Sequence, residues 1–125
     1  MSKYSFKIEV VPTYLPNESN PQEGLYVFSY QVTIGNFGEV AAQVIPRHWA
    51  ITDGNNKVEE VRGLGVVGQQ PLIRPGKGFQ YTSGTRLATP HGTMGGSFFC
   101  VAEDGERFEV PIETFILAAQ RRDLH

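Results

Sequence analysis

The chain has 125 residues, of which 40% are hydrophobic and 19% charged, so it is long enough for one core and too apolar for global disorder. Its formal net charge of -2 gives no overall attraction to nucleic acid or anionic lipid, and we expect neither as a partner. Its length predicts a single domain, residues 1–125. Fourteen glycines and eight prolines break up long helices, which favours short strands and turns.

The first half of the chain contains three segments with the periodicity of strands. Apolar and charged residues alternate from Phe6 to Val10, the pattern of a half-buried strand. The polar, turn-rich stretch 15–24 predicts a loop. Alternation is clearest from Tyr26 to Ile34, and a long strand is expected from Val40 to Thr52.

The second half predicts two hairpins and a strand between them. Asp53-Gly54-Asn55-Asn56 is a hairpin signal, after which a shorter strand from Val58 to Arg62 should pair back. Prolines and glycines make residues 65–76 a connection. The remaining strands are expected at Phe79–Thr85, Ser97–Ala102 and Arg107–Phe115.

About seven short strands without a helical period predict an all-β fold, an antiparallel sandwich with Greek-key connections. A fibronectin type III or immunoglobulin-like topology is the leading expectation, and a small barrel is the alternative. The Cys, Trp and Cys signature of antibody domains is absent, because the chain has one cysteine and one tryptophan.

The sequence also bears on the cellular compartment. Cys100 is the single cysteine, which excludes an intrachain disulfide, and no signal-peptide pattern is visible at the N-terminus. No stretch approaches the roughly 20 apolar residues of a membrane-spanning helix. We therefore expect a cytoplasmic protein without membrane contact.

No set of residues has the pattern of a catalytic or metal site. His48, His91 and His125 are widely separated, without the ligand spacing of a zinc site. Ser83 lacks the G-x-S-x-G elbow, and Cys100 lies in an apolar strand, where a thiol is usually inert. We expect no catalytic residues, no metal, no cofactor and no enzymatic activity.

Gly63, Gly65 and Gly68 match the G-x-G-x-x-G pattern, which in nucleotide-binding folds brings backbone N–H groups to phosphate at a helix N-terminus. A helix is blocked by Pro71, and the acid that would hold a ribose is missing. Two interpretations remain open. The glycines shape a bulge and a loop, or a freestanding loop binds phosphate with Arg62.

Residues 61–102 contain no Asp or Glu. Four cations lie in this stretch, namely Arg62, Arg74, Lys77 and Arg86. On one shared face they would attract an anion, whereas strand alternation would scatter them over opposite faces.

Arg47-His48-Trp49 places a cation, an imidazole and the single tryptophan at consecutive strand positions. Strand alternation puts Arg47 and Trp49 on one face and His48 on the other. In one interpretation Trp49 anchors the core, and His48 is a surface or satisfied interior imidazole. In the other the three residues contact a protein partner, because Trp and Arg are enriched in binding hot spots.

The chain resembles the bacterial ApaG proteins over nearly its full length. The resemblance rests on many short motifs in the right order: Thr13-Tyr14-Leu15-Pro16, Tyr26-Val27-Phe28-Ser29-Tyr30, Arg47-His48-Trp49, Ile51-Thr52-Asp53, Val58 to Gly63, Gly65 to Gly68, Gln70-Pro71, Tyr81-Thr82-Ser83-Gly84, Thr89-Pro90, Gly92-Thr93-Met94 and Gly105-Glu106-Arg107-Phe108. It implies a fibronectin-type-III-like sandwich without established catalytic residues.

The resemblance also implies a function. ApaG proteins are associated with tolerance of divalent cations, cobalt and magnesium in particular, and related domains occur in eukaryotic F-box proteins and in a DNA-polymerase-interacting protein. We therefore expect a non-catalytic module that binds a protein partner and acts indirectly in cation tolerance. The alternative is a phosphate, pyrophosphate or nucleotide ligand on the Gly63–Gly68 loop, for which the family's glycine pattern has prompted proposals.

Overall fold

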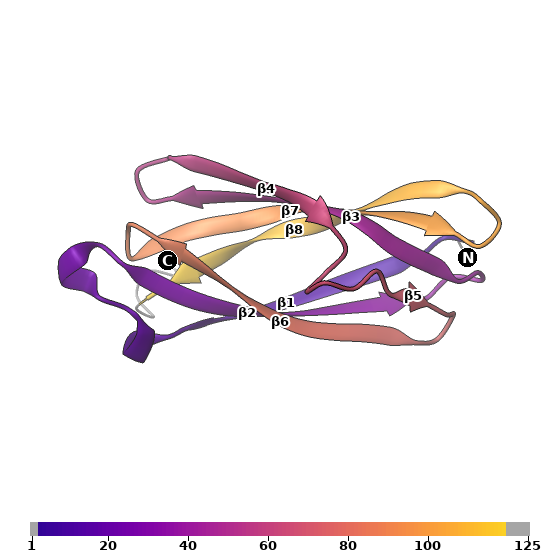
Figure 1. Cartoon of the computed structure of the whole chain (residues 1–125), viewed down its shortest axis with the longest axis horizontal. Coiled ribbons are helices and arrows are strands. Elements are labelled where there is room, and N and C mark those ends of the chain that lie inside the picture. The colour runs from indigo at the N-terminus through magenta and orange to yellow at the C-terminus, as the bar shows by residue number, and fades with distance from the viewer. Residues whose placement is uncertain (1–2, 120–125) are drawn as a thin grey trace.

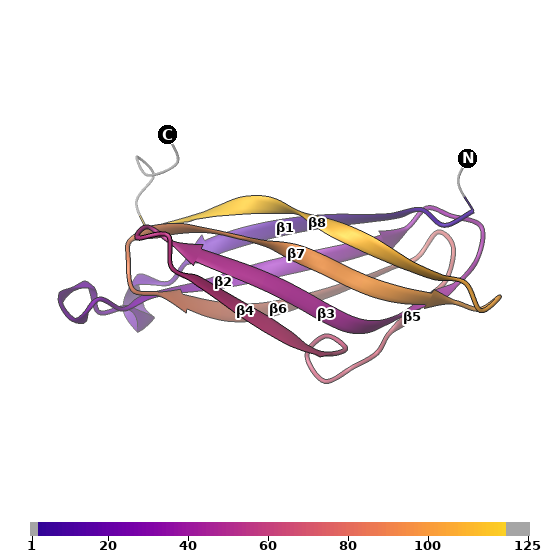
Figure 2. The ribbon, with the colours of Figure 1, turned by 90° about the horizontal axis from the view of Figure 1, so that it is seen from above.

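The computed structural model describes residues 3–119, which form two antiparallel sheets packed face to face (Figure 1; Figure 2). The strands are β1 (Phe6–Tyr14), β2 (Tyr26–Asn36), β3 (Ala42–Asp53), β4 (Val58–Leu64), β5 (Leu72–Ile73), β6 (Gly78–Leu87), β7 (His91–Ala102) and β8 (Arg107–Ala118). One sheet has the order β1-β2-β6 and the other the order β4-β3-β7-β8, with β5 paired to β3. The predicted fibronectin-type-III-like β-sandwich is confirmed.

The strands differ from the sequence predictions mainly in the glycine-rich start of β7 and in the predicted connection at residues 65–76. Strand β7 begins at His91, six residues before the predicted Ser97, because the glycine-rich start of this strand carries no alternating pattern. Gly96 lies so close to the carbonyl oxygen of His48 on β3 that no side chain fits there. The predicted connection contains the short strand β5, and the predicted loop at 15–24 contains two 3-10 turns, Pro16–Glu18 and Pro21–Glu23.

The core lies between the two sheets and is centred on Trp49. The alternation of β2 carries four side chains into it: Phe28, Tyr30, Val32 and Ile34, each no more than 6% exposed. Trp49 packs edge-on against Tyr30 at 5.3 Å between ring centroids, and against Phe98 and Phe115. Large aromatic surfaces removed from water supply much of the stability of such a core.

One side of the sandwich is closed by aromatic and polar contacts that join the start of β1, and the residues just before it, to the start of β8 and the β7–β8 turn. The Phe108 ring contacts Tyr4 and Phe6 at centroid distances of 5.3 and 5.6 Å. The Tyr4 hydroxyl donates to Asp104 at 2.7 Å, and Lys3 forms an ion pair with the same carboxylate at 3.0 Å. These hydrogen bonds lower the pKa of Asp104 to about 2. The opposite side of the sandwich is bordered by the edge strands β4 and β6.

Asn36 ties the end of β2 to two neighbouring segments. Its side chain is buried, and its amide nitrogen donates to the carbonyl oxygens of Val40 and Ile73, each at 2.9 Å. Its amide oxygen accepts from the Gly38 backbone N–H at 2.8 Å. The Asn36 side chain is stabilising, because without it these three backbone groups would have no hydrogen-bond partner in a region that water does not reach.

We expect Asn36→Ala to lower the free energy of unfolding by about 3 kcal/mol, since it leaves three backbone groups without a partner. Urea denaturation followed by circular dichroism measures the effect. Gln80→Ala is the control, because Gln80 makes an exposed side-chain hydrogen bond to Thr33 and its loss should cost less than about 0.5 kcal/mol. Equal losses in the two variants would contradict the role of Asn36.

Candidate functional site

A β-bulge in β3 sets the directions of the side chains around the candidate site. The pairing of β3 with β7 shifts register between Val44 and Arg47. Pro46 lies in this interval, where its missing N–H costs no ladder hydrogen bond. The extra residue places Val44 and Arg47 on the same inner face although they are three positions apart. Arg47 therefore points, like Trp49, into the space between the sheets.

The Arg47 guanidinium holds the chain segment that follows β4. Its Nη1 donates to the carbonyl oxygens of Leu64 and Gly65, at 3.2 and 3.0 Å. Gly63 is the residue opposite Arg47 in the β3–β4 pairing. A Cβ atom on Gly63 would lie 2.7 Å from Nη1, so the glycine makes room for the guanidinium.

The second half of the glycine pattern forms a tight turn. Val66 and Gln69 exchange backbone hydrogen bonds at 2.7 and 2.9 Å, with Val67 and Gly68 between them at φ values of 44° and 80°. Two left-handed residues in such a loop are typical of a type I′ turn. The Gly65 N–H donates to the carbonyl oxygen of Ile45, so the amides of Gly65 and Val66 are both already bonded.

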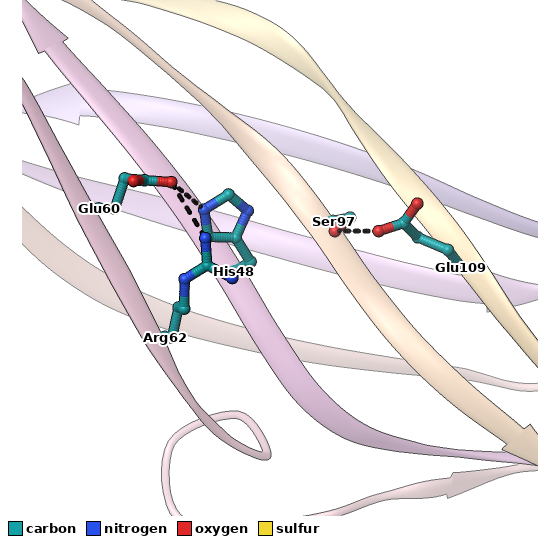
Figure 3. Close-up of polar contacts among 5 residues, drawn as sticks. All are labelled: His48, Glu60, Arg62, Ser97 and Glu109. Atoms are coloured by element: carbon teal, nitrogen blue, oxygen red, sulfur yellow. Dashed lines mark hydrogen bonds and ion pairs between the residues drawn. The ribbon is translucent and has the colours of Figure 1, made fainter.

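His48, Glu60 and Arg62 meet on the outer face of the β4-β3-β7-β8 sheet (Figure 3). His48 Nε2 lies 2.8 Å from Glu60 Oε1, and Arg62 Nη2 lies 3.3 Å from the same oxygen. The hydrogen bond from His48, followed by the charge of Arg62, lowers the pKa of Glu60. Ser97 and Glu109 form a second pair on this face at 3.0 Å.

A hollow of about 450 Å³ lies among these polar groups, and we call it the outer hollow. Leu64 and Phe99, which line it, are 68% and 38% exposed. Pro46 and Gly63 also line it. The outer hollow therefore combines exposed apolar side chains with the imidazole of His48 and the charged groups of Arg47, Arg62 and Glu109.

A second cavity, of about 400 Å³, lies between the sheets at the side bordered by β4 and β6, and we call it the inner cavity. Its lining includes Arg47 and Trp49 from β3, Val66 from the turn after β4, and Tyr81 and Ser83 from β6. Volumes of about 300–1,000 Å³ are typical of small-molecule sites. No histidine or cysteine is among the residues that line it.

Two residues that line the inner cavity carry a buried polar atom without a hydrogen-bond partner among the described residues: Trp49 Nε1 and Tyr81 Oη. Trp49 is 2% and Tyr81 is 8% exposed. Burial, and to a smaller extent Tyr30, raise the pKa of the Tyr81 phenol above its ordinary value, whereas the nearby Arg47 charge lowers it. Buried polar groups in native proteins are usually paired, so these two atoms require an explanation.

The structure separates the residues that the sequence grouped together. Arg47 and Trp49 face inward and His48 outward, and because Trp49 is buried it forms no exposed patch with its neighbours. Arg62 points away from the glycine turn toward Glu60, and Arg47 contacts the turn instead.

The four cations of residues 61–102 do not gather on one face. Arg62 lies on β4 and faces outward, Arg74 and Lys77 lie in the turn between β5 and β6, and Arg86 borders the inner cavity from β6. Sequence reasoning missed Tyr81 as a site residue. The alternation of β6 indicated which side chains face inward, but not that this hydroxyl would be buried beside Trp49.

The described residues give little support to other chemistry. Burial raises the pKa of the Cys100 thiol to about 12, so its nucleophilic thiolate is scarce at neutral pH. Within residues 3–119 no group of three or more His, Cys, Asp or Glu side chains is placed to hold a metal ion. The same part of the chain contains no helix with the length and apolar character needed to cross a membrane.

Comparison with known proteins identifies close relatives. The profile of the ApaG domain matches residues 16–102. The chain is 60% identical over 121 residues to Protein ApaG of Acidovorax sp., covering 95% of this chain and 88% of that protein. It is 54% identical over 120 residues to Protein ApaG of Dechloromonas aromatica, covering 96% and 94%.

A crystal structure described as the putative ApaA protein of Bordetella pertussis has the same fold. It superposes with a TM-score of 0.94 at 56% sequence identity, covering 96% of this chain and 98% of that chain. The likeness therefore extends over nearly the whole sandwich.

We expect Tyr81→Phe to raise the free energy of unfolding by about 1 kcal/mol, because it removes a buried hydroxyl that has no partner. Urea denaturation measures the change. Tyr14→Phe is the matched control, since Tyr14 lies on β1 outside the inner cavity and the same atom is removed. A clear loss of stability in Tyr81→Phe alone would mean that the hydroxyl is hydrogen-bonded in solution.

Proposed function

The chain belongs to the ApaG domain family, and from that premise we propose that it is a non-catalytic module that binds a protein partner. The outer hollow is the surface we assign to this partner. The observation that carries the proposal is the exposure of Leu64 and Phe99 side by side with charged groups. Exposed apolar side chains rimmed by polar residues are typical of interaction sites.

The chemistry of the outer hollow defines the partner segment that fits it. Leu64 and Phe99 gain free energy when an apolar side chain covers them, at about 25 cal/mol per Å² of apolar surface removed from water. Arg62 and Glu109 offer charges of both signs within reach of the same segment. The segment we propose has one apolar anchor flanked by charged residues of both signs.

The free edge of β4 adds a second means of attachment. Strand β4 pairs with β3 on one side and is at the edge of its sheet. An extended partner segment can hydrogen-bond to such an edge while its side chains fill adjacent pockets. Glu59, Glu60 and Arg62 lie on β4, and charges of this kind oppose indiscriminate strand pairing.

The effect on cation tolerance, which the family resemblance implies, fits this proposal as an indirect one. We propose that the protein acts in the cytoplasm through its partner and does not itself carry cobalt or magnesium. The proposal rests on the resemblance and on the absence of ligand spacing in the sequence.

The alternative is a phosphate, pyrophosphate or nucleotide ligand bound by Gly63, Gly65 and Gly68 with Arg62. Two observations speak against this alternative. The amides of Gly65 and Val66 already donate to backbone carbonyls. Arg62 lies on the outer face with Glu60, away from the turn.

A partner captured through the outer hollow should be lost when the hollow is changed. We expect Leu64→Glu to weaken its binding by about tenfold or more, because an apolar contact is replaced by a charge. The measurement is capture from source cells by tagged protein, followed by titration of the captured partner. Val11→Glu is the matched control, since Val11 is 59% exposed on β1 of the other sheet.

Equal capture by the parent chain, Leu64→Glu and Val11→Glu would contradict the assignment of the outer hollow. Circular dichroism of both variants checks that their folds are intact. A partner lost only in Val11→Glu would transfer the assignment to the outer face of the β1-β2-β6 sheet.

The alternative is tested by titrating ¹⁵N-labelled protein with pyrophosphate, with and without magnesium, and reading the amide signals of Gly63, Gly65 and Gly68. We expect no saturable shift at millimolar ligand, because two of the turn's amides are engaged. Saturable shifts confined to the turn, reduced in Arg62→Ala, would establish the anion site instead.

A further inference from the structure

We propose that the free edge of β6, beside the inner cavity, binds an extended protein segment that carries one inward-facing acidic side chain. This surface is separate from the outer hollow, because β6 belongs to the other sheet and the outer hollow is lined from β3, β4, β7 and β8. The inference does not rest on the partner proposed for the outer hollow.

Strand β6 is a long and regular edge of the β1-β2-β6 sheet. Among residues 3–119 it pairs with β2 alone, and this pairing runs from Leu87 to Gly78 without a register shift. Natural edge strands are usually kept from pairing by short length, bulges, prolines or charged side chains. The ten residues of β6 contain no proline, and their one charged residue is Arg86 near the end. The edge is therefore suited to pairing with a further strand.

Alternate residues of β6 direct their backbone groups to the open side. The Asn36 N–H donates to the carbonyl oxygen of Lys77 at 3.0 Å, which fixes the phase of the pairing between β2 and β6. Antiparallel strands bond through every second residue of each strand. The residues whose N–H and C=O groups point away from β2 are therefore Gly78, Gln80, Thr82, Gly84 and Arg86. These groups form the row of donors and acceptors that an added strand uses.

Gly84 gives a second reason to expect a strand at this edge. A Cβ atom at Gly84 would meet only the carbonyl oxygen of Phe28, at 3.4 Å, and its backbone is not left-handed. Packing within the chain therefore does not require a glycine there. A glycine inside a strand weakens it and often marks a place where another backbone approaches closely. We assign that approach to the bound segment.

The second half of β6 borders the inner cavity, so a strand added there would cover the cavity. Residues 83–86 of β6 line it together with Glu59 and Val61 of β4. Figure 2 shows β4 and β6 along the same border of the sandwich. The turn after β4 also lines the cavity, but its backbone hydrogen bonds are made within the turn and to Ile45. Every second side chain of an added strand would point between the sheets.

The charges around the inner cavity match one acidic side chain. Arg47, Arg86 and Glu59 line it, which leaves one positive charge in excess. An adjoining hollow of about 150 Å³ shares Arg86 and Glu59 and adds Asp53 and Lys57, whose charges cancel. Complementary charges across an interface favour one partner over others. An inward glutamate or aspartate of the bound segment supplies the missing charge.

A second copy of this chain matches the edge less well. Two β6 strands paired with each other would bring together two copies of Arg86 and two of Lys77, which directly precedes β6. No Asp or Glu lies between residues 61 and 102 to compensate them. Like charges brought together at an interface oppose association. A segment of another protein that carries an acid is therefore the occupant we assign.

The test is a titration of ¹⁵N-labelled protein with a capped hexapeptide of alternating valine and threonine that has one glutamate at its fourth position. We expect saturable shifts at millimolar peptide in the backbone amide signals of Thr82, Gly84 and Arg86. Two matched peptides carry glutamine or lysine at the fourth position. The glutamine peptide should bind about threefold more weakly than the glutamate peptide, and the lysine peptide more weakly still.

Two variants at one position separate backbone pairing from side-chain contact. Thr82→Pro removes an N–H of the open edge without removing a hydrogen bond to β2, and it should weaken peptide binding by about tenfold or more. Thr82→Val keeps this N–H and should bind like the parent chain. Circular dichroism and urea denaturation check that both variants fold.

A charge variant gives a test that does not depend on proline. Arg86→Glu changes the excess charge of the cavity lining from positive to negative, so the lysine peptide should then bind more tightly than the glutamate peptide. Leu64→Glu should retain binding of the glutamate peptide, because Leu64 lines the outer hollow. A failure of the partner proposal and a failure of this one are thus distinguishable.

Four results would overturn the proposal. The three amide signals do not shift with the glutamate peptide, or the three peptides bind equally, or a folded Thr82→Pro binds as tightly as the parent chain, or Arg86→Glu leaves the order of the peptides unchanged. A dimer found by sedimentation without peptide, with concentration-dependent shifts at the same three amides, would replace the assigned occupant by a second copy.

Discussion

The bulge at Ile45 and Pro46 is the constraint on which the core and both cavities depend. Side chains alternate strictly along a strand, so one added residue exchanges the two faces for everything that follows. Val44 is buried before the bulge, and Trp49 is buried after it. Without the extra residue His48 would point into the core, and the Trp49 contacts that hold the two sheets together would be lost.

The inward direction of the Arg47 side chain is the second consequence of the bulge. Arg47 lines both the inner cavity and the outer hollow. Its guanidinium holds the carbonyl oxygens of Leu64 and Gly65 and lies over Gly63, which explains why that position carries no side chain. The side chain of Leu64 borders the outer hollow, whereas Arg47 also lines the inner cavity. One cation thus organises a wall of each site, and the glycines around it serve packing and turn geometry.

The interior of the sandwich is uneven in how well its polar groups are satisfied. Asn36 uses three hydrogen bonds to join β2, β5 and the loop after β2. Trp49 Nε1 and Tyr81 Oη, in contrast, are buried without partners among the described residues, and other parts of both side chains line one cavity. Uncompensated polar burial lowers stability, and in proteins it is concentrated where a site requires it.

The sequence alone determined the class of fold and most strands, because alternation in β2, hairpin turns such as Asp53-Gly54, and frequent glycines are local signals. It could not place β5 or the first half of β7, since their pairing depends on distant strands. The faces of Arg47 and Trp49 relative to each other also followed from alternation. Which face became the interior was decided by the bulge, and the meeting of Tyr81 with Trp49 was decided by the packing of the two sheets. Those contacts join positions far apart in the chain, where no local pattern carries information.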